Sequence, residues 1–539
     1  MKKKLIVLLF MVVPMLTFAQ EKGLDQKIDA AFQPVSDFFS NLIFFTIPIA
    51  GIDVPFVLLL LVGSALFFTI YFKFPNIFHF KTAINVVRGK YDELDQHEAG
   101  DSALAVGGDI KGTIKDESTE GEVTHFQALA TAVSGTVGNG NIAGVALAIA
   151  LGGPGATFWM VVCGFLGMST KFVECTLGVQ YRDVGEDGTV YGGPMYYISK
   201  GLKERGFETF GKIVAVIFAI FCIGGSFGGG NAAQSNQATV VLKELMGLES
   251  SGAGFWIGVV MAIVVGVIII GGIKRIASVT EKVVPFMAVL YLLACLYILG
   301  ANFSLIDDAF SLIFREAFNP TAIGVGGVIG VLLVGFKRAA FSNEAGAGSA
   351  SIAHSAVKTK YSASEGLVAL LEPFIDTVVI CTMTALVIII FNFGGDASGA
   401  TIFQYGGDGA GAVLIDGVSY EGAGITSKAF AQYIPYSNVF LTVAVVLFAV
   451  STMISWSYYG LQSWKFLFGR GKAADMTYKL LFLLFVVIGA SASMKSIWAF
   501  SDAMIFAMVF PNMVGLYFLF PVVKEQLKRY TDAIKESKA

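Results

Sequence analysis

The chain has 539 residues, of which 55% are hydrophobic and only 14% charged. A water-soluble protein of this size could not bury so many apolar side chains away from solvent. A net charge of -3 provides no basic excess for neutralising phosphates, which argues against nucleic acid as a partner. The five cysteines stand far apart with no C-x-x-C pair, and we interpret them as packing residues rather than metal ligands. The sequence is therefore expected to encode an integral membrane protein.

The N-terminus, residues 1–19, has the pattern of a secretory signal peptide. Lysines at positions 2 to 4 precede an apolar run from Leu5 to Phe18, and the small residue Ala19 stands before the predicted cleavage site. The run is shorter than the roughly 20 residues of a membrane span, and an uncleaved anchor helix is the alternative. Either interpretation places residues 20–53 outside the cytoplasm. Their aromatic-rich part, 24–47, is predicted to form an amphipathic helix at the membrane interface.

Apolar runs long enough to cross a bilayer follow in the region 54–521, the predicted transmembrane domain. Eleven spans are predicted, near residues 54–73, 126–151, 155–180, 211–237, 254–272, 280–301, 320–347, 366–392, 430–458, 476–493 and 496–521. The predicted fold class is thus an all-α integral membrane protein.

Lysine and arginine in the connecting segments predict the orientation of these spans. With the N-terminus outside, basic residues concentrate in every second loop and in the tail 522–539, which are then cytoplasmic. This pattern predicts a multi-pass protein of the cell (inner) membrane with a cytoplasmic C-terminus. The acidic segment 92–122 is expected to be a cytoplasmic loop, and the segment 394–424, rich in Gly and Asp, is expected to cover the outer side.

Two of the predicted spans contain polar and small residues that would interrupt a helix. The second carries Ser134-Gly-Thr-Val-Gly-Asn-Gly-Asn141 at its middle, and the seventh carries Phe341-Ser-Asn-Glu-Ala-Gly-Ala-Gly348. Unwound backbone inside a membrane is tolerated only where protein or a watery cavity satisfies it. If the first span is set aside, ten remain in two sets of five, near 126–301 and 320–521, each opening with a broken helix. An odd repeat length inverts the second set, and matching interruptions in inverted halves indicate a transporter binding site.

Other interpretations of the first interruption are weaker. The spacing Gly138-x-Gly140-x-x-Ala143 matches a dinucleotide-binding fingerprint, but apolar helix rather than a strand precedes it. Small residues also permit close packing of helices, which explains Gly144 but not the asparagines at 139 and 141.

The segment from Gly121 to Val145, GEVTHFQALATAVSGTVGNGNIAGV, closely resembles the signature of the alanine or glycine:cation symporter family. The resemblance extends in family order through GGPMYYI (192–198), FKRAAFSNEAGAGSA (336–350), FIDTVVICTMTAL (374–386) and WSYYG (456–460). It implies a leading helix followed by a five-plus-five inverted repeat, with sodium-coupled symport of a small neutral amino acid. The signal peptide and the acidic insertion depart from the family's short form.

The resemblance also implies roles for individual residues. The amides of Asn139 and Gly140 would receive the substrate carboxylate, Gly138 would permit close approach, and Asn141 would organise the break. Further substrate contacts are expected from Gln234, Phe336, Phe341 and Trp456. Sodium would be held by the carbonyl oxygens of Ser134 and Val137 and the hydroxyl groups of Ser451 and Thr452. No cofactor is implied besides Na⁺ as the co-transported ion, and the oligomeric state is left open.

Several ionisable residues lie inside the predicted spans, where such groups are functional candidates. Lys171 with Glu174, and Glu372 with Asp376, stand at helical spacing near predicted span ends and are expected to pair or to contact water, while Glu344 lies in the second interruption. Asp376 would be the proton site if transport were coupled to H⁺.

Three alternatives to sodium symport differ in mechanism. Proton-coupled or uncoupled amino-acid transport on the same fold predicts activity without Na⁺. A passive channel is the second alternative, but a substrate site paired with an ion site suits a transporter that encloses its ligands better than a conducting pore. An enzyme would need convergent catalytic side chains, and the four histidines form no recognisable cluster in the sequence.

Overall fold

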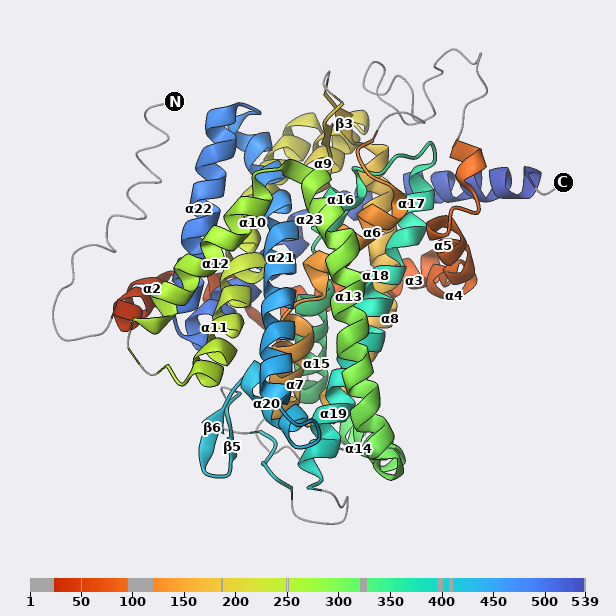
Figure 1. Cartoon of the computed structure of the whole chain (residues 1–539). Coiled ribbons are helices and arrows are strands. Elements are labelled where there is room, and N and C mark those ends of the chain that lie inside the picture. Colours follow the sequence, from red (N-terminus) through yellow and green to blue (C-terminus); the bar gives the residue numbers. More distant parts are fainter. Residues whose placement is uncertain are drawn as a thin grey trace.

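The computed structural model describes residues 24–49, 51–95, 121–185, 188–248, 250, 252–319, 327–394, 401–406 and 411–537. The described chain is a bundle of helices with three short antiparallel hairpins (Figure 1). The predicted signal peptide, most of the acidic segment and parts of the segment 394–424 lie outside the described residues.

Seven helical stretches are long and apolar enough to cross a bilayer by length and composition. They are α8 (Gly155–Gln180), α10 (Glu208–Phe227) continued by η4 (Gly228–Ala232) and α11 (Ala233–Met246), α13 (Gly272–Ala301), α17 (Ser362–Ala369) continued by α18 (Leu371–Pro373), η6 (Phe374–Cys381) and α19 (Thr382–Asn392), α21 (Ser437–Phe468), α22 (Lys472–Ser491) and α23 (Met494–Glu536).

The other four predicted spans correspond to shorter or broken helices. Two are short apolar helices, α3 (Phe56–Tyr71) and α12 (Ala253–Ile269). The third is a bent pair in which α6 (His125–Thr136) meets η3 (Gly140–Gly144) and α7 (Val145–Gly152) at 50°. The fourth is α15 (Gly327–Asn343), which is followed after a turn by α16 (Ala350–His354). Each predicted span thus has a helical counterpart, although only the seven stretches and the bent pair pass the length and hydropathy test.

The two interrupted helices run in opposite directions. In Figure 1 the chain descends from α6 to α7 and ascends from α15 to α16. This arrangement agrees with the predicted inversion of the second half relative to the first.

Shorter elements lie at the two ends of the bundle and beside it. They are α2 (Leu24–Ile43), β1 (Thr46–Ile49), β2 (Ile52–Pro55), α4 (Pro75–Phe78), α5 (Phe80–Val87), η2 (Asp92–Asp95), β3 (Asp183–Val184), β4 (Val190–Tyr191), α9 (Pro194–Glu204), η5 (Phe303–Leu305), α14 (Ile306–Phe318), β5 (Val413–Ile415), β6 (Val418–Tyr420) and α20 (Ala423–Ala431). β3 and α9 lie at the upper end in Figure 1, and α14, α20 and the β5–β6 hairpin lie at the lower end. β3 and α9, which lie between spans in segments predicted to be cytoplasmic, are therefore at the opposite end from α14, α20 and the β5–β6 hairpin, which lie in segments predicted to be extracytoplasmic.

The predicted amphipathic helix is α2, and it packs against α23. The hydroxyl of Ser36 donates to the carbonyl oxygen of Ser496 (2.8 Å), and the amide of Ser493 donates to the carboxylate of Asp29 (3.0 Å). Phe32 is buried whereas Phe38 is 63% exposed, so the helix has one face on the bundle and one apolar face turned outward.

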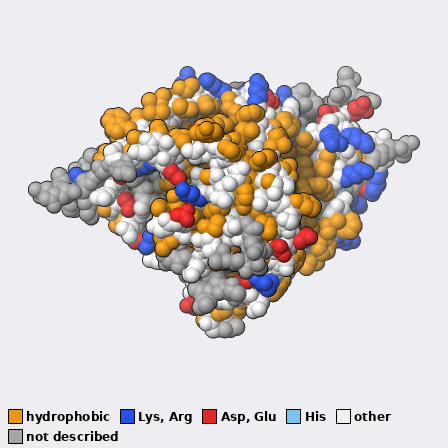
Figure 2. All heavy atoms as spheres, turned by 60° about the horizontal axis from the view of Figure 1, so that its bottom comes forward, with side chains coloured by type: hydrophobic (Ala, Val, Ile, Leu, Met, Phe, Trp, Pro, Cys, Tyr) orange, Lys and Arg blue, Asp and Glu red, His pale blue; other side chains and the backbone are white. Residues whose placement is uncertain are grey.

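Large apolar side chains are exposed along the flank of the bundle. On α12 and α13 they include Trp256, Val260, Ile263, Phe286 and Leu293. Figure 2 shows apolar side chains covering much of the visible flank, with Lys and Arg gathered near its edges. Such a surface is suited to lipid rather than water.

Candidate functional site

The first helix break is built by local sequence. α6 begins with a capping box in which Thr124 and Gln127 satisfy each other's backbone amides. The helix ends at Thr136, and the chain re-enters helical structure at Gly140. Gly138 is required here because a Cβ atom would lie 2.4 Å from the hydroxyl oxygen of Thr452.

Side chains from other helices hold the break open. The amide nitrogen of Asn139 donates to Oε1 of Gln234 (3.0 Å), and its side-chain nitrogen donates to the Gln234 carbonyl oxygen (3.1 Å). Oδ1 of Asn141 accepts from the Gly138 amide (2.9 Å), while Nδ2 of Asn141 donates to the carboxylate of Asp376 (2.6 Å). These contacts replace the intrahelical hydrogen bonds that the break removes.

The second break lies between α15 and α16. Glu344 has a positive φ of 56°, and Gly346 and Gly348 follow with φ of 96° and 82°. The side chain of Asn343 accepts a hydrogen bond from the Ala345 amide (3.0 Å) and donates one to the hydroxyl of Thr377 (3.0 Å). The motif FSNEAGAG therefore interrupts the helix, because its glycines adopt conformations that other residues rarely take.

A small cavity lies between the two breaks. Its volume is about 10 Å³, room for roughly one water molecule. An amino acid would enter only with a movement of the walls. The lining residues come from both halves of the chain: Gly135, Thr136, Gly140, Gly229, Gln234, Phe341, Glu344, Trp456 and Ile505.

The breaks leave backbone groups of both polarities without partners near this cavity. Among the described residues, no group donates to the carbonyl oxygens of Gly135, Thr136 and Val137 at the end of α6. Within the same part of the chain, the Gly140 amide donates to no backbone carbonyl oxygen. Carbonyl oxygens at a helix C-terminus favour cations, and amides at a helix N-terminus favour anions. The cavity thus lies between a cation-binding and an anion-binding backbone end.

Three of the four residues predicted to hold sodium are joined by hydrogen bonds beside this break. The hydroxyl of Thr452 donates to the carbonyl oxygen of Ser134 (3.0 Å), and the hydroxyl of Ser134 donates to the carbonyl oxygen of Ser451 (2.8 Å). The hydroxyl of Ser451 donates to the Phe448 carbonyl oxygen (3.0 Å) within α21. Val137 is buried, and among the described residues no hydrogen bond joins it to the other three residues of the predicted sodium site. Hard oxygen donors of this kind fit an alkali cation.

The predicted substrate residues fall into three groups. Gly140, Gln234, Phe341 and Trp456 line the cavity. Gly138, Asn139 and Asn141 shape the break behind it, and the Asn139 amide predicted to receive a carboxylate is engaged by Gln234. Phe336 lies elsewhere: it packs edge-on against Trp159, with ring centroids 5.9 Å apart. It stands five positions before Phe341 on α15, and this spacing turns the two rings to different sides of the helix.

Sequence reasoning missed Gly135, Thr136, Gly229 and Ile505 as lining residues and left Glu344 in second place. Gly229 could have been found, because the run Gly228-Gly229-Gly230 inside the fourth span marks a close approach. A Cβ atom at Gly230 would lie 2.1 Å from Cγ of Trp456, so this run admits the indole ring. Nothing in the sequence singles out Ile505.

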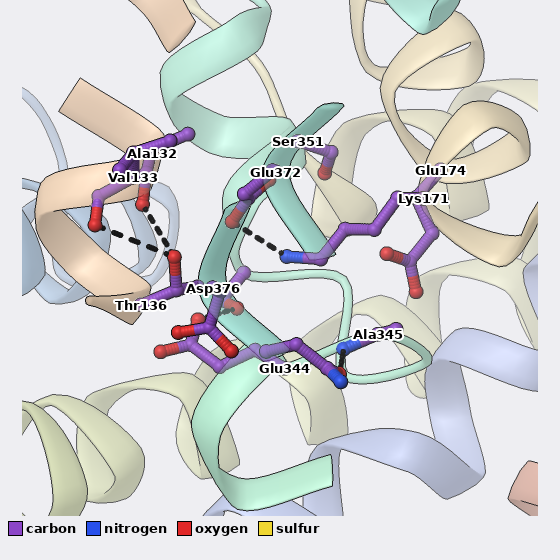
Figure 3. Close-up of polar contacts among 12 residues, drawn as sticks. Ala132, Val133, Thr136, Lys171, Glu174, Glu344, Ala345, Ser351, Glu372 and Asp376 are labelled. Carbon is purple, nitrogen blue, oxygen red and sulfur yellow. Dashed lines mark hydrogen bonds and ion pairs between the residues drawn. The ribbon is translucent and has the colours of Figure 1, made fainter. Parts of the chain in front are cut away.

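The buried ionisable residues pair across helices rather than along them. Lys171 on α8 donates to Glu372 on α18 (3.0 Å), and all four residues Lys171, Glu174, Glu372 and Asp376 are buried (Figure 3). Lys171 is therefore in a structural ion pair, as expected, but its partner is Glu372 on another helix and not Glu174 on its own helix. Helical spacing fixes which residues share a face, but the packing of α17 and α18 against α8 decides which charges meet.

Two histidines also come together. Nδ1 of His354 lies 2.5 Å from Oε1 of Glu365, and Nδ1 of His125 contacts Oε2 of the same carboxylate. This pairing escaped the sequence analysis because positions 125 and 354 belong to the two different halves. No group of three or more His, Cys, Asp or Glu side chains within the described residues could hold a metal ion, and all five cysteines are free and buried.

A multi-pass helical bundle with two interrupted helices around a closed polar cavity defines a membrane transporter rather than an enzyme. The chain belongs to the sodium:alanine symporter family, which matches residues 46–539. Members of this family carry out sodium-coupled amino-acid symport.

Curated relatives cover most of the chain. The sodium/alanine symporter AgcS of Methanococcus maripaludis is 38% identical over 482 residues, which are 89% of this chain and 95% of that protein. The sodium/proton-dependent alanine carrier protein of Bacillus sp. PS3 is 32% identical and covers 78% of this chain and 91% of its own length. The probable sodium/glutamine symporter GlnT of Bacillus subtilis is 32% identical over 78% of this chain and 81% of its own. Among solved structures, MhsT in complex with L-phenylalanine aligns with a TM-score of 0.48 and 15% identity over 77% of this chain and 99% of its own.

Proposed function

We propose that this chain is a sodium-coupled symporter for a small neutral amino acid, alanine or glycine, and works by alternating access. The observation that carries the proposal is the cavity between two helix breaks, lined by residues of both halves and adjacent to the Ser134–Thr452 oxygen cluster. Binding at a junction of two halves allows their relative movement to expose the site to each side in turn.

The substrate carboxylate would be received by the Gly140 amide, and by the Asn139 amide once the side chain of Gln234 moves aside. Phe341 and Trp456 wall the cavity and would limit the size of the substrate side chain.

Sodium would replace the hydrogen bond between Thr452 and Ser134. The ion would then contact the carbonyl oxygens of Ser134 and Val137 and the hydroxyl groups of Ser451 and Thr452. Since α6 and α21 belong to different halves, the ion would stabilise one relative arrangement of them, which couples its binding to that of the substrate.

The proposed location is the inner membrane, with the N-terminus outside and the C-terminus in the cytoplasm. The concentration of Lys and Arg at one set of loops supports this orientation.

Proton coupling is the second candidate. Asp376 is a buried carboxylate beside the first break, and one relative is named a sodium/proton-dependent carrier. In that case Asp376→Asn, rather than Thr452→Ala, would abolish uptake.

Uptake of labelled alanine into proteoliposomes tests the proposal. An inward Na⁺ gradient, K⁺ in its place, and a proton gradient alone are compared. Accumulation only with Na⁺ supports symport, whereas accumulation with protons alone would replace it by the proton-coupled mechanism. Failure to accumulate alanine or glycine under any gradient would overturn the substrate assignment.

A further inference from the structure

Glu344 presents a buried carboxylate at the substrate cavity. It is the first residue after α15, and it lines the cavity while being only 2% exposed. Oε1 accepts a hydrogen bond from Nε1 of Trp456 (2.8 Å), and Oε2 accepts one from the hydroxyl of Ser349. Two donors therefore fix the carboxylate in place.

Among the described residues, no cation lies within ion-pair distance of this carboxylate. The Lys171 charge acts on Glu344, but its ammonium group is engaged by Glu372 at 3.0 Å (Figure 3). His354 and His125 both contact Glu365. Within the described part of the chain, Glu344 forms no ion pair with any Lys, Arg or His. Neutral donors offset only part of the cost of burying a charge, so a cationic partner at this position would be strongly favourable.

The first break presents groups of both polarities to the same cavity. The Gly140 amide can donate a hydrogen bond to an anion. The carbonyl oxygens of Gly135 and Thr136 and the carboxylate of Glu344 carry negative charge or partial charge and favour a cation. An α-amino acid carries both charges on one carbon atom. A cavity with one positive and one negative end matches this charge pattern.

We propose that the Glu344 carboxylate binds the ammonium group of the substrate and selects α-amino acids over 2-hydroxy acids. This inference rests on the proposed function and names the residue that recognises the amine. Substrate binding would bring the missing positive charge to Glu344, and the second break would thus contribute a full charge to recognition in addition to backbone dipoles.

The test measures equilibrium binding of L-alanine and L-lactate to the purified protein and to Glu344→Gln at saturating Na⁺. Lactate carries a hydroxyl group where alanine carries the ammonium group. We expect the dissociation constant of alanine to rise at least about tenfold in the variant, whereas that of lactate should change less than twofold. The dissociation constant of lactate divided by that of alanine therefore falls. A purely structural role of Glu344 would weaken both ligands equally and would overturn the proposal.

Glu174→Gln is the matched control. Glu174 is also a buried carboxylate, but it accepts from Asn512 (2.7 Å) and does not line the cavity. If Glu174→Gln lost alanine binding to the same extent, removal of any buried carboxylate would weaken binding. That result would refute the assignment of Glu344 to the substrate ammonium group. If Glu344→Gln does not fold, Glu344→Asp serves instead, since it keeps the charge but withdraws it by one methylene; we expect weaker alanine binding with unaltered lactate binding. Absence of alanine binding to the unaltered protein would instead overturn the proposed function itself.

Discussion

The hydroxyl of Thr452 donates a 3.0 Å hydrogen bond to the carbonyl oxygen of Ser134, and the hydroxyl of Ser134 returns a 2.8 Å bond to the neighbouring Ser451 carbonyl. These two bonds fasten the broken end of α6 to the middle of α21. If the two halves move relative to each other, α6 and α21 must either move together or break these two hydrogen bonds. An ion bound here is therefore well placed to control that movement.

Replacing both hydroxyl groups of the junction tests the sodium site. Ser451→Ala combined with Thr452→Ala removes two of the proposed oxygen ligands, and we expect the Na⁺ concentration for half-maximal alanine uptake to rise at least about tenfold, which corresponds to roughly 1.4 kcal/mol. Uptake titrated against Na⁺ measures this. The control is Ser457→Ala on the same helix, because among the described residues that hydroxyl bonds only to the Ile454 carbonyl of its own helix (2.6 Å). An unchanged Na⁺ requirement in the double variant would place the ion elsewhere.

The first break can be filled without altering the rest of the helix. Gly140 lines the cavity, and a Cβ atom there would already contact Cα of Ser342 at 3.4 Å and Phe341 at 3.6 Å, so the two further methyl groups of Gly140→Val should crowd the cavity wall. We expect alanine binding to be lost while the protein stays folded, as measured by calorimetry and size-exclusion chromatography. Gly144→Ala, whose Cβ would meet Trp498 at an ordinary 3.6 Å, should bind normally. Retained affinity in Gly140→Val would contradict the carboxylate site.

The position of Trp456 depends on a glycine of the fourth span. A Cβ atom at Gly230 would lie 2.1 Å from Cγ of the indole, so Gly230→Ala must displace the ring from the cavity wall. We expect alanine binding to weaken about tenfold or more, because the wall is misplaced. Gly300→Ala, with nothing within 4 Å of the added atom, is the control in binding assays. Equal affinity of the two variants would mean that Trp456 does not shape the site.

The buried pair of Lys171 and Glu372 is predicted to stabilise the fold. Lys171→Met removes the nearer partner of the buried Glu372 carboxylate and leaves it only His354 at 3.6 Å among the described residues; losing one partner of a buried pair costs about 3–5 kcal/mol. Thermal unfolding in detergent should show a marked fall in Tm, and Lys171→Met with Glu372→Gln should recover part of it. Lys212→Met, which breaks a surface pair with Glu208 (2.8 Å), should change Tm little. A Tm for Lys171→Met equal to that of the surface variant would show that the buried pair contributes no stability.

The sequence alone determined the helical bundle, its interruptions and the family. Inside a membrane, long apolar segments can satisfy their backbone hydrogen bonds only as helices. The small and polar residues at 134–141 and 341–348 interrupt two of those helices whatever the surrounding packing. The family resemblance also predicted that Ser134 and Thr452 contribute oxygen atoms to the same site.

Tertiary structure decided which side chains meet. Lys171 faces Glu372 instead of Glu174, His125 and His354 share Glu365, and Phe336 turns toward Trp159 rather than toward the cavity. It also brought Glu344 to the cavity wall beside Trp456, which lies 112 positions away. Periodicity reports the face of one helix, whereas partners on other helices depend on how those helices pack, and that information is spread over the whole chain rather than over any one motif.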